Sequence, residues 1–140
     1  MLPIALALAV TGTVAYHLVT KLMPAGAHPI ATLLVAYVFG SVLCAGILLA
    51  TPSATGFRGL FSPVNWTAPA LAVVVIVIDL AFILLYRAGF PISLGALVTQ
   101  AAAAVALLAF GVLLFKDRLT ASHLAGVLLC LGGLWLLNRD

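Results

Sequence analysis

The sequence predicts an all-α fold: a polytopic membrane protein that forms a bundle of five transmembrane helices. Of its 140 residues, 66% are hydrophobic and 6% are charged, whereas a water-soluble domain carries about 25% charged residues. The apolar residues also form long blocks without an amphipathic period. Such blocks face lipid and one another rather than water.

Five apolar segments remain when the chain is divided at its Pro, Gly and charge clusters, each close to the roughly 20 residues that cross a bilayer. They comprise residues 2–22, 30–50, 69–87, 92–115 and 122–137. We interpret residues 1–140 as a single transmembrane domain. The last segment is short and crosses if its flanking charges snorkel. The first has neither a positively charged start nor an early cleavage site, so we expect it to stay in the mature protein.

Short connections make neighbouring segments antiparallel in a compact bundle. The longer connection, residues 51–68, carries aromatic and apolar side chains that we expect in the lipid headgroup layer. Within it, Asn65-Trp66-Thr67 matches a glycosylation sequon, which we interpret as a chance match. Cys44 and Cys130 lie inside apolar segments and indicate neither a disulfide framework nor a metal site.

The charges argue against nucleic-acid binding and leave the orientation open. The net charge is +3, but the cations are scattered singly at segment ends and form no basic patch. Lys and Arg normally mark the cytoplasmic side, yet here three lie on each side. These are Arg58, Lys116 and Arg118 on the side of the N-terminus, and Lys21, Arg87 and Arg139 on the other. Such balance is typical of a chain that inserts both ways and pairs as an antiparallel homodimer. A fixed topology set by something other than charge is the alternative.

Asp79 is the most informative residue, because it lies at the middle of the third segment. A carboxylate there costs about 2.5–3.5 kcal/mol to insert. Ionised, it needs a cation or a water-filled cavity, and burial favours the neutral form, so it can gain and lose a proton. Either state suits a transporter, whose sites lie near the midplane. The alternative is a permanent interhelical pair that holds the bundle together.

Two aromatic residues, Phe82 and Tyr86, share the helical face of Asp79. A carboxylate flanked by aromatic rings can accept an organic cation through charge and cation–π attraction. Ordinary packing is the alternative for both rings.

The first segment supplies a polar stripe in which Thr13, His17, Thr20 and Lys21 fall on one face. We predict that this stripe points inward. His17 is either a proton relay or partner of Asp79, or a neutral imidazole that bonds to a carbonyl or hydroxyl group. Lys21 is interpreted as a snorkelling anchor near the membrane surface.

Weakly polar rows on two other segments are candidates for lining a cavity. Tyr37 and Ser41 lie in the second segment and Gln100 in the fourth. Interhelical hydrogen bonds explain such residues equally well. The chain has no nucleophile elbow, phosphate loop, paired carboxylates or histidine cluster, so we expect no enzyme activity, cofactor or metal.

The last third of the chain carries a specific motif, Gly111-Val-Leu-Leu-Phe-Lys-Asp-Arg-Leu-Thr120, followed by Gly126 and by Leu131-Gly-Gly-Leu-Trp-Leu-Leu137. It resembles the end of the repeat in EamA-type transporters of the drug/metabolite transporter superfamily. The start, from Gly12 to Lys21 and on through Pro24 and His28-Pro29, is similar to that repeat's first span and turn. The resemblance covers essentially the whole chain.

The resemblance implies one repeat of an inverted-repeat transporter, because common members carry two repeats. A single repeat must pair with itself to build a whole transporter. Two departures concern the site: many relatives have an arginine about where Tyr37 lies, and a proline near Gln100. The small multidrug resistance proteins of the same superfamily use a glutamate in their first span, which this chain lacks, so their mechanism is not transferred.

We therefore expect a transporter of small polar metabolites or organic cations that works as an antiparallel homodimer by alternating access. Its partners would be itself, a small-molecule substrate and the lipid bilayer, and its location the inner membrane of a prokaryotic cell. Asp79 is the expected proton or substrate site, helped by His17. The alternative is a non-transporting subunit of a larger complex, such as a heteromeric lipid-linked sugar flippase; purification of a stable assembly without a partner chain would count against it.

Overall fold

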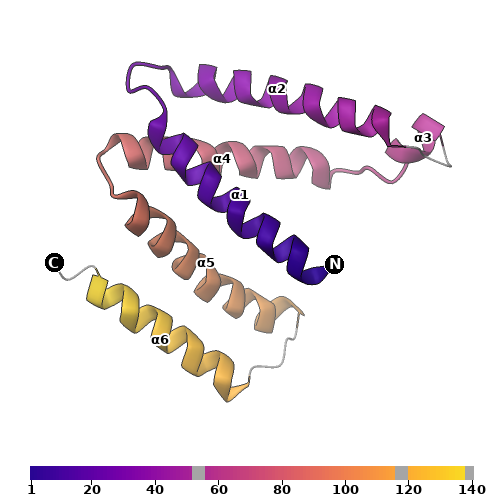
Figure 1. Cartoon of the computed structure of the whole chain (residues 1–140). Coiled ribbons are helices and arrows are strands. Elements are labelled where there is room, and N and C mark those ends of the chain that lie inside the picture. Colours follow the sequence, from indigo (N-terminus) through magenta and orange to yellow (C-terminus); the bar gives the residue numbers. More distant parts are fainter. Residues whose placement is uncertain (52–55, 116–119, 138–140) are drawn as a thin grey trace. The chain divides into compact units, whose positions relative to one another are not determined.

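The computed structural model describes residues 1–51, 56–115 and 120–137, and all regular secondary structure in these ranges is α-helical. The helices, drawn in Figure 1, are α1 (Leu2–Leu22), α2 (Pro29–Ala50), α3 (Gly56–Phe61), α4 (Thr67–Arg87), α5 (Ile92–Phe115) and α6 (Ala121–Leu137). The prediction of an all-α fold is confirmed. The motif residues Lys116–Leu119 and the cation Arg139 lie outside the described residues.

Four of the described helices, α1, α2, α4 and α5, are long and apolar enough to cross a membrane. The chain is therefore a multi-pass membrane protein. Helix α6 has 17 residues and a length of about 25 Å, less than the roughly 30 Å of the hydrocarbon core. A fifth crossing is accordingly part of the topology proposed below.

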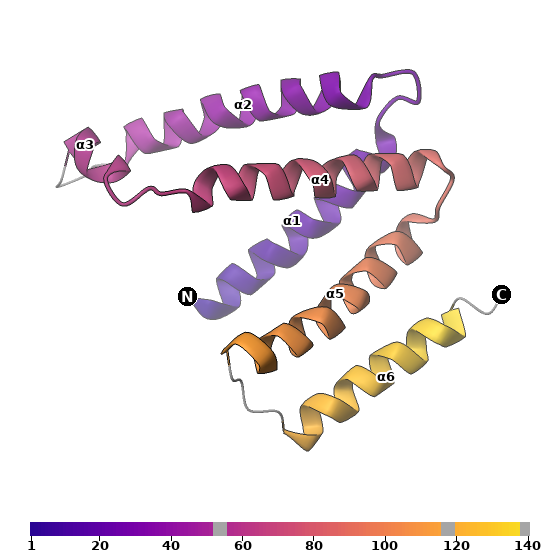
Figure 2. The same cartoon turned by 180° about the vertical axis from the view of Figure 1, so that it is seen from behind.

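The chain divides into two compact units. The terminal unit comprises Met1–Val19 and Ala88–Asp140, and the central unit comprises Thr20–Arg87. In the terminal unit α5 packs against α6, and in the central unit α2 packs against α4. Both views show α2 and α4 side by side and antiparallel, with the short helix α3 at the turn between them (Figures 1 and 2).

Most large apolar side chains point away from the protein interior. Leu34 and Val35 on α2, for example, expose 64% and 69% of their surface, whereas the buried hydrophobic side chains among the described residues are Ile83, Tyr86 and Leu33, at 2%, 5% and 7%. An apolar surface this extensive is not stable in water. Lipid or other membrane helices must cover it, and the backbone tolerates this because its polar groups bond within each helix.

Local chemistry explains where α4 begins. The Asn65 side chain accepts hydrogen bonds from the Thr67 amide at 3.0 Å and from the Thr67 hydroxyl at 2.6 Å, so it caps the first turn. The helix therefore starts two residues before Pro69, the start predicted from sequence. Proline is tolerated there because amides of the first turn lack intrahelical partners. This role also gives Asn65 a structural reason to occupy the sequon.

The end of α4 depends on a glycine. Gly89 has a φ of +88°, in the left-handed region that side chains with a Cβ rarely adopt. It follows the last helical residue, Arg87, by two positions, where such a glycine typically ends a helix. The turn into α5 is thereby kept to a few residues.

Two cations tie the end of α4 to the turn between α1 and α2. Lys21 Nζ donates to the carbonyl of Tyr86 at 3.3 Å. Arg87 Nη2 donates to the carbonyls of Pro24 at 3.2 Å and Ala27 at 2.5 Å. We call this set of three hydrogen bonds the carbonyl latch. It supplies donors to carbonyl groups at the end of a helix and in a turn, where intrahelical partners are lacking.

Replacing Arg87 with Gln removes the charged donor of two latch bonds. We expect the free energy of unfolding to fall by about 1–2 kcal/mol, the range for charge-assisted hydrogen bonds at a partly exposed position. Thermal unfolding of the purified protein in detergent measures this. Arg87→Lys is the matched control: it keeps the charge but lacks the planar fork, so its melting temperature should be intermediate. An Arg87→Gln protein that melts with the wild type would contradict a stabilising latch.

Candidate functional site

The candidate site is centred on a hydrogen bond between the middles of α2 and α4. The Tyr37 hydroxyl donates to Asp79 Oδ2 at 2.7 Å, and both side chains are half-buried. Asp79 is the single acidic residue in the part of the chain that the structure describes. A donor on the facing helix offsets part of the cost of placing a carboxylate at this depth, because hydrogen bonds to charged groups contribute about 1.5–3 kcal/mol.

The second carboxylate oxygen of Asp79 has no hydrogen-bond partner among the residues that the structure describes. Within the described ranges, the bond from Tyr37 to Oδ2 is the one hydrogen bond that this carboxylate makes. A carboxylate can accept at both oxygens. The pair therefore holds the carboxylate in one orientation and leaves Oδ1 for a proton, a water molecule or a cationic group.

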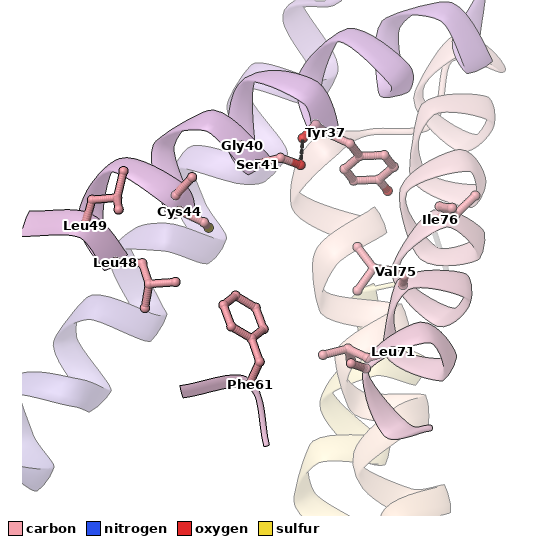
Figure 3. A pocket seen from close by; sticks show the side chains of 13 residues that line it. Tyr37, Gly40, Ser41, Cys44, Leu48, Leu49, Phe61, Leu71, Val75 and Ile76 are labelled. Carbon is pink, nitrogen blue, oxygen red and sulfur yellow. Dashed lines mark hydrogen bonds between the residues drawn. The ribbon is translucent and has the colours of Figure 1, made fainter. Parts of the chain in front are cut away.

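A groove begins at Tyr37 and extends between α2 and α4 toward α3; we call it the α2–α4 groove. Its volume is about 1090 Å³. Figure 3 shows the ring of Phe61 from α3 between the two helices, with Leu48 on one side and Leu71 on the other. The groove lies entirely within the central unit.

The walls of the α2–α4 groove are apolar except for Tyr37, Ser41 and Cys44. The Ser41 hydroxyl donates to the carbonyl of Tyr37 at 2.6 Å (Figure 3), so its proton is used within its own helix. Cys44 is a free thiol. The phenol of Tyr37, which is bonded to Asp79, therefore supplies the strong polar group at one end of an otherwise apolar groove.

Sequence reasoning selected His17 rather than Tyr37 as the partner of Asp79. His17 exposes 5% of its surface and its ring meets that of Tyr16 edge to face, with 5.1 Å between ring centroids. It belongs to the terminal unit, whereas Asp79 belongs to the central unit. The pairing of His17 with Asp79 stays a prediction. The hydrogen bond from Tyr37 was missed, because the search for a partner of Asp79 used the polar stripe on the first segment and Tyr37 lies on the second.

The other predicted residues have more local roles. The Thr13 hydroxyl donates to the carbonyl of Ala9 at 2.8 Å on α1, and Gln100 is exposed on α5. The rings of Phe82 and Tyr86 contact each other at 5.9 Å, and Lys21 Nζ lies 5.6 Å from the Tyr86 ring. These two rings therefore extend from Asp79 toward the carbonyl latch and do not line the α2–α4 groove.

No group of three or more metal-ligating side chains occurs among the residues that the structure describes. The pair of Tyr37 and Asp79 thus offers one carboxylate and one phenol, a set suited to holding a proton or a cation. Comparisons with protein families, with curated proteins and with solved structures found no match to this chain.

Replacing Tyr37 with Phe should leave Asp79 without its donor. We expect the free energy of unfolding to fall by about 1–3 kcal/mol, because a polar group in the membrane then lacks its partner. Adding Asp79→Asn should recover much of this loss, so the double-mutant cycle should show coupling of about 1 kcal/mol or more. Chemical unfolding in detergent measures it. Ser41→Ala, which removes a bond within α2, serves as control, and additive effects at positions 37 and 79 would contradict a functional pair.

Proposed function

We propose that this protein is a transmembrane transporter of small polar metabolites or organic cations that works as an antiparallel homodimer by alternating access. The observation that carries the proposal is the carboxylate of Asp79, held by Tyr37 near the middle of α4 with one oxygen open to a further partner. Intramembrane acids are costly and are characteristic of proton and substrate pathways.

The same geometry suggests how the site would work. Tyr37 donates to Oδ2 and fixes the carboxylate, while Oδ1 binds a proton or a cationic group of the substrate. Losing that ligand leaves a charged carboxylate in a low-dielectric region, so the empty ionised site is unfavourable unless water reaches it. A ligand at Asp79 would therefore favour closure, and its release would accompany opening to one side.

The dimer is proposed from the charge balance together with the resemblance to EamA-type transporters. Five spans, with α6 as the fifth, would form one repeat, and two copies in opposite orientations would reproduce an inverted-repeat transporter. The first four spans of each copy would enclose the substrate cavity. The proposed location is the inner membrane of a prokaryotic cell.

Substitution of Asp79 by Asn should reduce transport at least tenfold, equivalent to about 1.4 kcal/mol, because the amide cannot carry the charge. A thermal-shift screen against amino acids, organic cations and sugar phosphates would first select the ligand, and uptake of that ligand into proteoliposomes would give the rate. Cys130→Ala on α6 is the control and should transport normally. Unchanged uptake by the Asp79→Asn protein would remove this residue from the proposed role.

Changing the charge balance should decide the topology. We expect a tag on the C-terminus of the wild-type protein to be reached from both sides of the membrane. Adding a single lysine to either side should bias insertion to one orientation. Each biased variant should be inactive alone, and the two should be active together. Full transport by each biased variant alone would contradict the antiparallel dimer.

A further inference from the structure

We propose that the carbonyl latch binds the head group of an anionic phospholipid from the surrounding bilayer. The head-group phosphate contacts Lys21 and Arg87, the two cations of the latch. One acyl chain follows a shallow groove along α2 that begins at the same turn. The inference goes beyond the proposed transport and does not involve Asp79: it assigns a lipid site at the membrane edge of the central unit.

Two positive charges lie at the end of α4. Lys21 Nζ donates to the carbonyl of Tyr86, and Arg87 is the next residue. The latch bonds go to neutral carbonyl groups, so they leave the net charge of this end positive. The one acidic residue in the sequence of the central unit is Asp79, eight residues before Arg87 and about 12 Å along the helix. Charge complementarity therefore selects an anion as the ligand.

Arg87 has a donor group left for such an anion. Both of its latch bonds come from Nη2. Its Nε is enclosed and has no hydrogen-bond partner among the residues that the structure describes. A guanidinium carries donors on all three nitrogens, so Nη1 remains for an acceptor from outside the chain. Phosphate oxygens suit this role, because arginine binds phosphate through short, charge-assisted hydrogen bonds.

The position of the two cations favours a lipid over a soluble anion. Lys21 and Arg87 each lie in the last turn of a helix that is long and apolar enough to cross the membrane. Charges at such helix ends lie at the level of the lipid head groups. Anionic phospholipids present their phosphates at that level, and basic residues between membrane helices bind these head groups.

A shallow groove along α2 is joined to the latch by one residue. Ala27 accepts a hydrogen bond from Arg87 through its carbonyl and also lines this groove. The groove runs from Ala27 to Phe39 and has a volume of about 610 Å³; we call it the Ala27–Phe39 groove. It lies entirely within the central unit. Head group and chain can therefore be held by one continuous stretch of the protein.

The length and chemistry of the Ala27–Phe39 groove suit an acyl chain. From His28 to Phe39 the distance is about 17 Å at 1.5 Å per residue, close to the roughly 15 Å that one leaflet contributes to the hydrocarbon core. The polar lining residues, His28 and Thr32, lie at the end near the latch. Farther along, Val35 and Phe39 expose 69% and 67% of their surface. A soluble phosphate would leave these apolar side chains uncovered.

Binding of dioleoylphosphatidylglycerol to the full chain in detergent, measured by native mass spectrometry, tests the head-group site. Lys21→Gln and Arg87→Gln should each weaken binding about fivefold, because each removes one basic residue near the lipid surface. Phosphatidylcholine with the same acyl chains has no net charge and should bind at least fivefold more weakly. Arg58→Gln is the matched control: it removes a cation from α3, at the turn between α2 and α4 (Figure 1), and should bind like the wild type.

A second set of measurements tests the acyl-chain site and the source of the phosphate. Ala36→Phe fills the Ala27–Phe39 groove at an exposed position and leaves both cations in place, so it should weaken binding of the lipid. Ala72→Phe makes the same change in the α2–α4 groove and should have no effect. Inorganic phosphate in large excess should not displace the lipid, because it lacks the chain. Thermal unfolding without added lipid checks that each variant is folded.

Each opposite result would overturn the proposal. Equal binding by the wild type, Lys21→Gln and Arg87→Gln, or an equal loss in Arg58→Gln, would show that the latch cations are not a specific site. Displacement by inorganic phosphate would assign these cations to a soluble anion instead. If Ala36→Phe separates a dimer but binds the lipid normally, a second copy rather than an acyl chain covers the Ala27–Phe39 groove.

Discussion

The arrangement of the central unit depends on one constraint: a carboxylate near the middle of a membrane helix must be given a partner. Hydrocarbon cannot solvate a carboxylate, so a neighbouring helix that presents a donor lowers the cost of Asp79. Tyr37 does so from α2, and the bond specifies which faces of two almost uniformly apolar helices meet. Apolar contacts alone would specify this rotation weakly, because lipid competes for them on nearly equal terms.

Helix positions could be predicted from sequence because they depend on local chemistry. Apolar length, proline, glycine and charge are all visible in the chain, and the structure places the five long helices within two residues of the predicted bounds. The short helix α3 falls in the connection 51–68 and was not predicted. The largest difference, the earlier start of α4, comes from the Asn65 side chain capping Thr67. The sequence does show an Asn two residues before a Thr, a pattern that can cap a helix. The predicted start followed Pro69 instead, because proline is a common first-turn residue.

The partner of Asp79 could not be predicted in the same way. Helices α2 and α4 are apolar on nearly every face, so their sequences contain no period that reveals which side chains meet. His17 and Tyr37 are both plausible donors, and the choice between them depends on the pairing and rotation of helices, which is non-local. The sequence pointed to Tyr37 only as a weakly polar residue within an apolar segment, which made it a candidate for lining a cavity rather than the partner of Asp79. The α2–α4 groove is likewise a product of packing and leaves no local pattern.

The bonds between α2, α4 and the preceding turn are distributed unevenly along the central unit, and this has a mechanical consequence. At one end the carbonyl latch anchors the turn before α2 to the last residues of α4, and further along Tyr37 is bonded to Asp79. Beyond Tyr37, toward Phe61, the lining of the groove is almost entirely apolar. Apolar surfaces can slide or part in lipid at little cost, whereas polar bonds cannot. Polar bonds therefore hold the two helices together from the carbonyl latch to Asp79. From Tyr37 to the α3 end, apolar contacts and the connecting segment alone hold them, so the carboxylate lies at the boundary between a rigid and a more deformable part of the central unit.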